Sequence, residues 1–316
     1  MNREHTDLSI VIPIWNEEPV FGILTERLEA LLTRLPPRTE VLLVDDGSTD
    51  ASGVRIREVC AANPRFKGIL FSRNFGQQAA ISAGLHYARG EAVAVMDADL
   101  QDAPELLVEF CEKLRQGYDV VYAVRQHRKE SLWKRGAYAL FYRLLRTIAA
   151  VPIPLDSGDF CLMSRRVVNL IKSMPERHRF IRGMRAWIGF SQCAFPCPRD
   201  AREHGRSKYT LLRLARLALD GICAFSVAPL RLATCLGFLT ALAAMGWGAY
   251  IVVWRLLTNQ PIPGFATLAA GICFLGGVQL ITIGILGEYV GRIYTEIKQR
   301  PLFVVDQLIG IGDGSD

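Results

Sequence analysis

Two long uncharged segments near the C-terminus constrain the fold of this chain more than any other feature. Residues 232–254 and 264–286 are each 23 residues long and contain no Asp, Glu, Lys or Arg. As helices with a rise of about 1.5 Å per residue, they would each span roughly 34 Å, enough to cross a hydrocarbon core of about 30 Å. We therefore expect two transmembrane helices. The alternative is a pair of helices buried in a soluble core.

Basic residues flank this pair of segments and predict its orientation. The connector, residues 255–263, carries two prolines and one basic residue, whereas the outer flanks carry Arg213, Arg216, Arg231, Arg292, Lys298 and Arg300. The positive-inside rule then places both flanks in the cytoplasm. We expect a multi-pass protein of the cell (inner) membrane whose termini and N-terminal part are cytoplasmic.

The surplus of basic residues is also localised. Residues 123–150 hold seven Arg or Lys against one acid, a difference equal to the net charge of +6 of the whole chain. Residues 138–153 alternate apolar side chains with Arg143 and Arg146, as an interfacial helix does. This favours anionic lipid, and not nucleic acid, as the partner. A solvated face on an ordinary surface helix is the other interpretation.

The first half of the chain alternates β-rich runs with helical patterns, which predicts an α/β domain. Composition supports a globular core, because 50% of the residues are hydrophobic and only 22% are charged, which excludes a disordered chain or a coiled coil. The expected strands are 8–14, 40–44, 68–72, 92–96 and 120–123, and the expected helices are 18–35, 51–62, 78–89 and 104–116. A βα array of this kind predicts a mainly parallel sheet covered by helices on both faces.

Polar residues follow each of the first four strands, where parallel sheets bind ligands. Asp97 and Asp99 flank Ala98 just after a strand, and such paired carboxylates suit a hard divalent cation, Mg²⁺ or Mn²⁺, that bridges substrate phosphates. The chain has neither a dinucleotide-binding glycine fingerprint nor a GxxxxGK loop. Gly310, Gly312 and Gly314 stand in a tail that we expect to be disordered.

These motifs together resemble those of the family-two glycosyltransferases with a GT-A (Rossmann-like) fold. The similarity is to the polyprenyl-phosphate branch, which includes bactoprenol glucosyltransferases and dolichyl-phosphate mannose synthases. Of these two classes, the bactoprenol glucosyltransferases resemble the chain more. The motifs are VIPIWNEE, VLLVDDGSTD, SRNFGQQAAISAGL, MDADLQD, DSGDFCLMSRR and REHGRSKYT, followed by the two apolar segments.

The resemblance implies a division of the chain into four parts. Residues 1–137 would form the nucleotide-sugar-binding half of the GT-A domain, and residues 138–222 the acceptor-side half with amphipathic juxtamembrane helices. Residues 223–291 would hold the two transmembrane helices, and residues 292–316 a cytoplasmic tail.

The resemblance also implies roles for individual residues. Those implied to bind the donor are Pro13, Trp15, Glu17, Val44, Asp46, Gln77, Asp97, Ala98, Asp99 and Gln101. Of these, Asp97, Asp99 and Gln101 would hold Mg²⁺ or Mn²⁺, and Trp15 stands where the family more usually has Tyr. The residues implied to contact phosphate or the acceptor are Arg125, Arg135, Arg202, Ser207 and Lys208. The catalytic set would be Asp99 with Asp156 or Asp159, and the family resemblance favours Asp159.

The expected reaction is inverting transfer of a hexose, glucose from UDP-glucose first of all, to undecaprenyl or another polyprenyl phosphate at the cytoplasmic face. A lipid monophosphate is largely deprotonated at neutral pH, so as a nucleophile it needs little help from a base. The alternatives are another sugar (mannose, an N-acetylhexosamine or an aminopentose), a processive polysaccharide synthase, or a non-catalytic scaffold that binds a nucleotide sugar. The resemblance is also compatible with a homotetramer.

Overall fold

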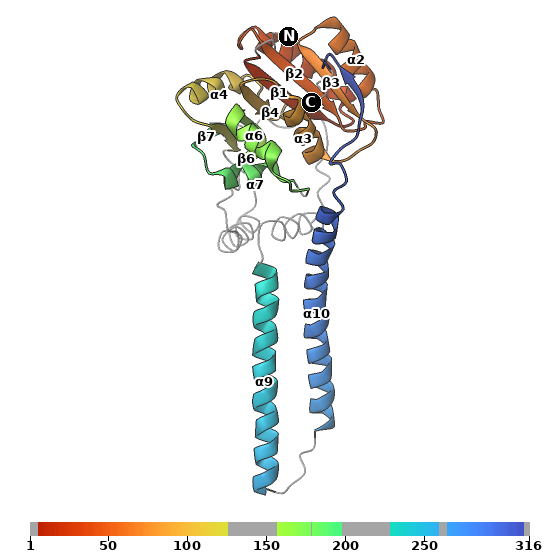
Figure 1. Ribbon diagram of the computed structural model, residues 1–316, viewed down its shortest axis with the longest axis vertical. Helices are drawn as coiled ribbons and strands as arrows, with labels where there is room; N and C mark the ends of the chain where they lie inside the picture. Colours follow the sequence, from red (N-terminus) through yellow and green to blue (C-terminus); the bar gives the residue numbers. More distant parts are fainter. Residues whose placement is uncertain (1–5, 126–156, 178, 198–227, 259–263, 313–316) are drawn as a thin grey trace. The chain divides into compact units, whose positions relative to one another are not determined.

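The computed structural model describes residues 6–125, 157–177, 179–197, 228–258 and 264–312 (Figure 1). The described chain falls into two compact units. One unit contains the described residues up to 197 together with residues 300–312, and we call it the sheet unit. The other contains residues 228–258 and 264–299, and we call it the hairpin unit.

The elements of the N-terminal half confirm the predicted βα array, with small changes at their ends. The strands are β1 (Leu8–Ile14), β2 (Thr39–Asp45), β3 (Phe66–Phe71), β4 (Ala92–Val95) and β5 (Val120–Arg125), and the helices are α1 (Glu18–Leu32), α2 (Ser52–Ala62), α3 (Gln77–Tyr87) and α4 (Leu106–Arg115). Five further elements of the sheet unit were not predicted: β6 (Ser157–Ser164), α6 (Arg165–Ser173), α7 (Ile181–Ile188), β7 (Gln192–Cys197) and β8 (Val305–Ile309).

All eight strands form one sheet, in the order β7-β5-β6-β4-β1-β2-β3-β8. The pairs β1–β2, β1–β4, β2–β3 and β5–β7 are parallel, and the other three pairs are antiparallel. The prediction of a mainly parallel sheet is therefore confirmed. Because β1, β2, β3 and β4 run in one direction, the loops that follow them meet at one edge of the sheet.

Helices cover both faces of the sheet and bury a core on each. On one face Leu24 and Leu28 of α1, Ile56 of α2 and Phe110 of α4 pack against the strands. On the other face the core contains side chains of α3, α6 and α7, including Ile81 and Val167. Gly84 allows α3 to lie close to β1, because a Cβ there would stand 2.1 Å from Cγ1 of Val11.

Residues 305–312 contradict the expectation of a disordered tail, whereas Gly314 lies outside the described residues. Strand β8 pairs antiparallel with β3 at the edge of the sheet, with Gly68 opposite Ile309 and Leu70 opposite Gln307. Gly310 follows with a φ of +68°, in the left-handed region that glycine adopts without strain. The glycine of this stretch therefore ends an edge strand, and the described tail is part of the sheet unit.

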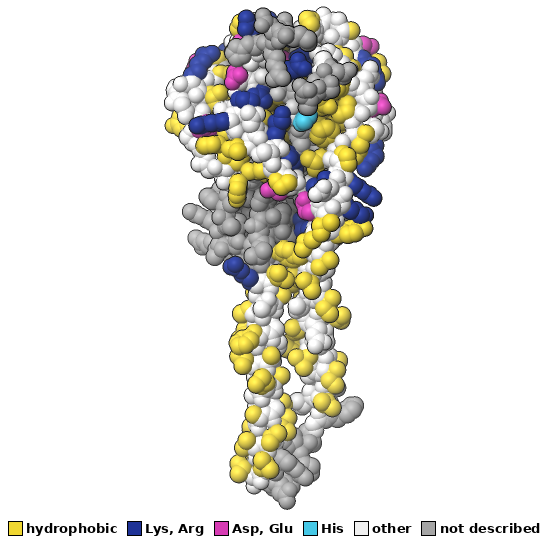
Figure 2. Space-filling view, viewed as in Figure 1, with side chains coloured by type: hydrophobic (Ala, Val, Ile, Leu, Met, Phe, Trp, Pro, Cys, Tyr) yellow, Lys and Arg dark blue, Asp and Glu magenta, His cyan; other side chains and the backbone are white. Residues whose placement is uncertain are grey.

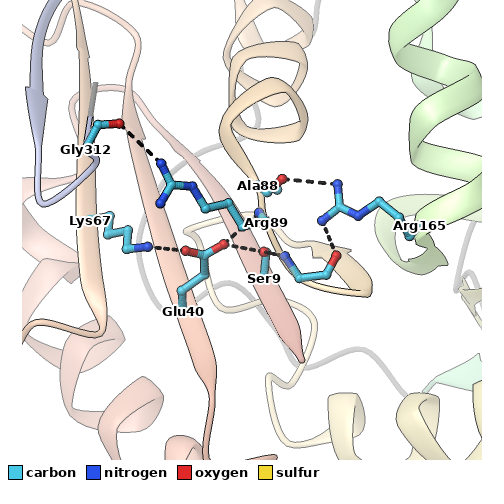
Figure 3. A network of polar contacts seen from close by, with 8 residues as sticks. Ser9, Glu40, Lys67, Ala88, Arg89, Arg165 and Gly312 are labelled. Carbon is cyan, nitrogen blue, oxygen red and sulfur yellow. Dashed lines mark hydrogen bonds and ion pairs between the residues drawn. The ribbon is translucent and has the colours of Figure 1, made fainter. Parts of the chain in front are cut away.

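A buried network at the amino ends of the strands joins several of these elements (Figure 3). The Glu40 carboxylate accepts hydrogen bonds from the Ser9 hydroxyl (2.6 Å) and the Arg89 backbone N–H (2.9 Å), and it forms an ion pair with Lys67. The Arg89 guanidinium in turn donates to the backbone oxygen of Gly312 (3.2 Å). The network thus links β1, β2, β3 and the chain after β8.

The hairpin unit consists of two long helices, α9 (Ala228–Thr258) and α10 (Phe265–Ile297). Within them, Leu230–Trp254 and Ala270–Ile297 are long and apolar enough to cross a membrane, and the protein buries none of the residues in the apolar window of either segment. Figure 2 shows hydrophobic side chains along both helices. The predicted apolar helices at 232–254 and 264–286 are thereby confirmed as helices, and both extend beyond the predicted bounds.

Candidate functional site

The loops after β1 and β2 are tied together at the carboxyl edge of the sheet. Asn16, in the left-handed region with a φ of +54°, accepts a hydrogen bond from the backbone N–H of Thr49 (2.7 Å), and its own N–H donates to the Ser48 hydroxyl (3.0 Å). Trp15 beside it is 55% exposed, although it follows a strand that is buried except at Pro13. An exposed indole at this edge offers a flat surface on which a base can stack.

Asp46 holds the loop that follows β3, residues 73–77, which we call the 73–77 loop. Its carboxylate accepts hydrogen bonds from the backbone N–H groups of Phe75 (2.7 Å) and Gly76 (2.9 Å) and from the Asn74 side chain (3.0 Å). Gly47 makes this contact possible, because a Cβ there would lie 2.3 Å from the backbone carbon of Arg73. Burial raises the pKa of Asp46, and the two backbone N–H groups oppose that rise.

A row of polar contacts runs from this loop into the centre of the site. The Gln77 side chain, at the first turn of α3, donates to Asp97 (2.8 Å) and lies 3.5 Å from Asp159. Asp159, on β6 and 5% exposed, forms a two-point ion pair with Arg182 of α7, with N–O distances of 2.6 and 3.0 Å. Asp97 and Asp159, 62 positions apart in the chain, thus share one hydrogen-bond donor.

Asp97 stands among carboxylates, and this crowding suits a cation. Burial and the negative charges of Asp159 and Asp99 raise the pKa of Asp97 to about 7. Leu100, at a φ of +54°, makes a tight turn in which the backbone N–H of Gln101 donates to Asp99 (3.2 Å). A left-handed leucine is rare and costs on the order of 1 kcal/mol or more, and such strain clusters at functional sites.

The side-chain oxygen atoms around Asp97 are suitable ligands for a hard divalent cation. Gln101 is 6% exposed, and its side-chain oxygen has no hydrogen-bond partner among the described residues. Carboxylate and amide oxygens are the ligands that Mg²⁺ and Mn²⁺ take. Within the part of the chain that the structure describes, no group of three or more His, Cys, Asp or Glu side chains is arranged around a common point. A cation here would draw its remaining ligands from substrate phosphates and water.

The other predicted site residues are placed as follows. Pro13 and Glu17 are half-buried beside Trp15, whereas Val44 and Ala98 are buried, at 0% and 4% exposure. Arg125 ends β5, and its side chain lies outside the described part, as do Asp156, Arg135, Arg202, Ser207 and Lys208 and the amphipathic segment 138–153. Of the expected site residues, the structure therefore joins Gln77, Asp97 and Asp159 by hydrogen bonds, and it places the other described ones at the carboxyl ends of neighbouring strands or in the loops that follow.

Two arginines of α7 were missed from the sequence. Arg182 is the ion-pair partner of Asp159, and Arg185 is 1% exposed with its guanidinium 4.7 Å from the centre of the Tyr122 ring. Nε and Nη2 of Arg185 have no hydrogen-bond partner among the described residues. The available signal was the spacing of three between two basic residues in an otherwise apolar helix, which places both on one face.

The chain resembles known proteins over nearly its whole length. Residues 9–171 match the family described as Glycosyl transferase family 2, and residues 228–293 match the GtrB C-terminal hairpin. An uncharacterized glycosyltransferase from Synechocystis sp. is 42% identical over 96% of both chains. The prophage-derived bactoprenol glucosyl transferase of Shigella flexneri is 38% identical over 94% of this chain and 97% of its own.

Among solved structures, a Pyrobaculum calidifontis mannosyltransferase in complex with GDP-Man and Mn²⁺ aligns with 94% of this chain and 89% of its own. The TM-score is 0.46 and the sequence identity 15%, a likeness too low to say more about this chain.

Proposed function

The chain belongs to glycosyl transferase family 2, and from this premise we propose that it transfers glucose from UDP-glucose to undecaprenyl or another polyprenyl phosphate. The similarity to bactoprenol glucosyl transferases extends over the hairpin as well as the sheet unit. A lipid acceptor lies in the membrane, and α9 and α10 are two helices long enough to anchor the enzyme there.

One observation carries the catalytic part of the proposal, namely the row of contacts from Gln77 through Asp97 and Asp159 to Arg182. It joins the loop beside the donor site to the carboxylate on β6. In this proposal Trp15 stacks on the base, Pro13 and Glu17 line the same pocket, and the buried Val44 and Ala98 lie behind it. Asp46 acts through the 73–77 loop that it holds.

A divalent cation, Mg²⁺ or Mn²⁺, is part of the proposal. Asp97, Asp99 and the unpartnered oxygen of Gln101 would hold it. When bound, such a cation neutralises the charge that develops on a departing nucleoside diphosphate. Arg125, Arg135, Arg202 and Lys208, together with the hydroxyl group of Ser207, are proposed to contact phosphate groups of donor and acceptor.

The chemistry then follows from charge and position. An oxygen of the lipid phosphate attacks the anomeric carbon, and the bond to the nucleoside diphosphate breaks with both electrons leaving on that group. One such displacement inverts the anomeric configuration. Asp159, held in place by Arg182, orients the acceptor or takes its remaining proton, and Asp156 is the alternative for this role. Because the nucleophile is already an anion, positioning contributes most of the rate.

The return of the chain to the sheet supports the proposed membrane topology. Strands on both sides of the hairpin in sequence, β7 before it and β8 after it, belong to one folded sheet. If both helices cross the membrane, the sheet unit and both termini lie on one side, which we propose is the cytoplasm. A homotetramer, suggested by the family resemblance alone, belongs to the same proposal.

A donor panel tests this proposal. Purified full-length protein would be incubated with undecaprenyl phosphate, Mg²⁺ or Mn²⁺, and UDP-glucose, GDP-mannose or UDP-N-acetylglucosamine. We expect a glycolipid with UDP-glucose, and none from the variant Asp99→Ala, whose membrane insertion should be unchanged. Transfer by Asp99→Ala at the parent rate would contradict the cation site. Transfer from another donor in place of UDP-glucose would show that the enzyme uses a different sugar. Formation of a sugar polymer would favour a processive polysaccharide synthase.

A further inference from the structure

The C-terminal segment, residues 300–312, lies directly beside the 73–77 loop although more than 220 positions separate them. The backbone oxygen of Val304 accepts a hydrogen bond from the N–H of Ser72 (3.1 Å), one residue before the loop. Phe71 pairs with Val305 across an irregularity in the β3–β8 ladder. The segment thus reaches the carboxyl end of β3, where the 73–77 loop begins.

Three aromatic rings connect the segment to the loop. The Phe303 ring stacks on Phe71, with centroids 5.3 Å apart and planes inclined by 4°. Phe71 and Phe75 of the loop form a T-shaped pair, with ring centroids 5.8 Å apart and planes at 89°, and the Arg73 guanidinium lies 4.1 Å from the centre of the Phe75 ring. Aromatic pairs in these geometries are attractive beyond the area they bury.

The loop is therefore held from two sides. Asp46 binds its backbone at Phe75 and Gly76, and the aromatic row supports it from the side of the C-terminal segment. Gln77, the last residue of the loop, donates to Asp97. A shift of the loop by a fraction of an ångström would misplace this donor, because hydrogen bonds weaken steeply with distance and angle.

The C-terminal segment also makes contacts that hold it in place and that do not involve the 73–77 loop. The Arg57 side chain of α2 donates to the Gln307 side chain (3.0 Å), and Arg89 donates to the oxygen of Gly312 (3.2 Å; Figure 3). Together with the β3–β8 ladder, these contacts fix residues 305–312 without help from Phe303. Removing the Phe303 ring should leave the strand in place and release only the support of the loop.

We propose that Phe303 is a positioning residue for donor binding, which acts through Phe71 and Phe75 on the 73–77 loop. This inference rests on the proposed function, because it assumes that the loop borders the nucleotide-sugar pocket. It gives the end of the chain a role in the reaction besides that of an edge strand.

The test compares Phe303→Ala with Gln307→Ala, a matched change on the same segment that removes a contact to α2 and none to the aromatic row. For full-length protein we would measure the KM for the donor, the KM for the lipid acceptor, kcat and the affinity for UDP with Mg²⁺. Phe303→Ala should raise the donor KM and the dissociation constant of UDP by between about twofold and tenfold, which corresponds to the loss of one aromatic pair. The acceptor KM should stay unchanged, and Phe303→Tyr should restore the parent values.

Hydrogen exchange of the Phe75 and Gly76 amides supplies a readout that does not depend on turnover. We expect faster exchange of both in Phe303→Ala, and parent rates in Gln307→Ala. If Phe303→Ala does not fold, Phe303→Leu keeps an apolar side chain and loses the stacking, and the same results are expected of it. Parent values of donor KM, UDP affinity and loop exchange in a folded variant would overturn the inference. A parent protein that transfers no sugar to lipid would instead overturn the proposed function.

Discussion

At the scale of residues, the pair of Asp159 and Arg182 determines what the site can do. Asp159 is 5% exposed, so it is nearly removed from water and depends on Arg182 for compensation. An uncompensated buried charge costs on the order of 3–5 kcal/mol. Arg182 therefore fixes the place of the carboxylate on which the proposed reaction depends.

We predict that Arg182→Met lowers kcat by about 10- to 100-fold and changes the donor KM by less than about threefold, because it disturbs the acceptor side of the site. The matched control is Arg166→Met, which breaks another arginine–aspartate pair, with Asp119, at the Ser164 end of β6. Steady-state kinetics with both substrates would decide. Equal losses in the two variants would show that the effect is structural.

Gly47 is a second residue whose local geometry predicts the effect of a substitution on stability and nucleotide binding. It combines a φ of +66° with a close approach to Arg73, so a methyl group has no room. We predict that Gly47→Ala destabilises the protein by more than about 1 kcal/mol and weakens nucleotide binding. Gly22→Ala is the control, because nothing lies within 4 Å of a Cβ in that helical position. Thermal unfolding with and without UDP measures both effects, and unchanged stability of Gly47→Ala would contradict the account of this loop.

At the scale of elements, Glu40 joins three strands to the end of the chain. Burial alone would raise the pKa of Glu40, but hydrogen bonds from Lys67, Ser9 and the Arg89 backbone hold it below its usual 4.5. A carboxyl group with a lowered pKa in the folded state stabilises the protein above its usual pKa, and that contribution is lost as the pH falls through the folded value.

We therefore predict that Glu40→Gln lowers the unfolding free energy at pH 7 by about 1–3 kcal/mol. Below pH 4.5 the difference from the parent protein should shrink, because the parent then loses the same interaction. Glu58→Gln, which removes an exposed ion pair with Arg55, should change little at any pH. Unfolding curves of full-length protein between pH 3 and 7 would measure this, and a pH-independent difference for Glu40→Gln would refute it.

The sequence predicted some elements well and others not at all, for physical reasons. The first four βα units are local, since each buried strand leads into an amphipathic helix within 30 residues, and periodicity is visible at that range. Strands β6, β7 and β8 pair with partners far away in the chain, which no local pattern reveals. The glycines after β8 favoured disorder, although the apolar residues Val305, Leu308 and Ile309 pack against the core.

The same difference between local patterns and distant contacts applies to the residues of the candidate site. Asp97, Asp99, Gln77 and Asp159, with Asp156 as the alternative to Asp159, were expected because they belong to motifs that resemble those of a known family. Arg182 offered only its spacing of three from Arg185 as a signal, and Phe303 offered none, because their contacts are with residues 23 and 232 positions away. Asp46 was expected to bind the donor, and in the structure its carboxylate accepts hydrogen bonds from the backbone of the neighbouring loop, a contact that the sequence did not predict.

At the scale of the whole molecule, the two helices of the hairpin lie in sequence between β7 and β8, so the sheet gains its last strand only after the second helix. If both helices cross a membrane, as we propose, this connectivity places both outer ends of the hairpin on the same side. We predict that a cysteine at position 260 reacts with an impermeant thiol reagent from outside intact cells, after the native thiols are blocked or replaced. A cysteine at Asp306 should react only from the cytoplasmic side. Labelling of both positions from the same side would contradict the topology.

The central claim concerns what is transferred and what is released. The decisive measurement is mass spectrometry of both products after the full-length protein has reacted with UDP-glucose and undecaprenyl phosphate. We predict that the lipid gains a single hexose on its one phosphate and that UDP appears in equal amount. Unchanged lipid, or a lipid diphosphate with release of UMP, would contradict the account.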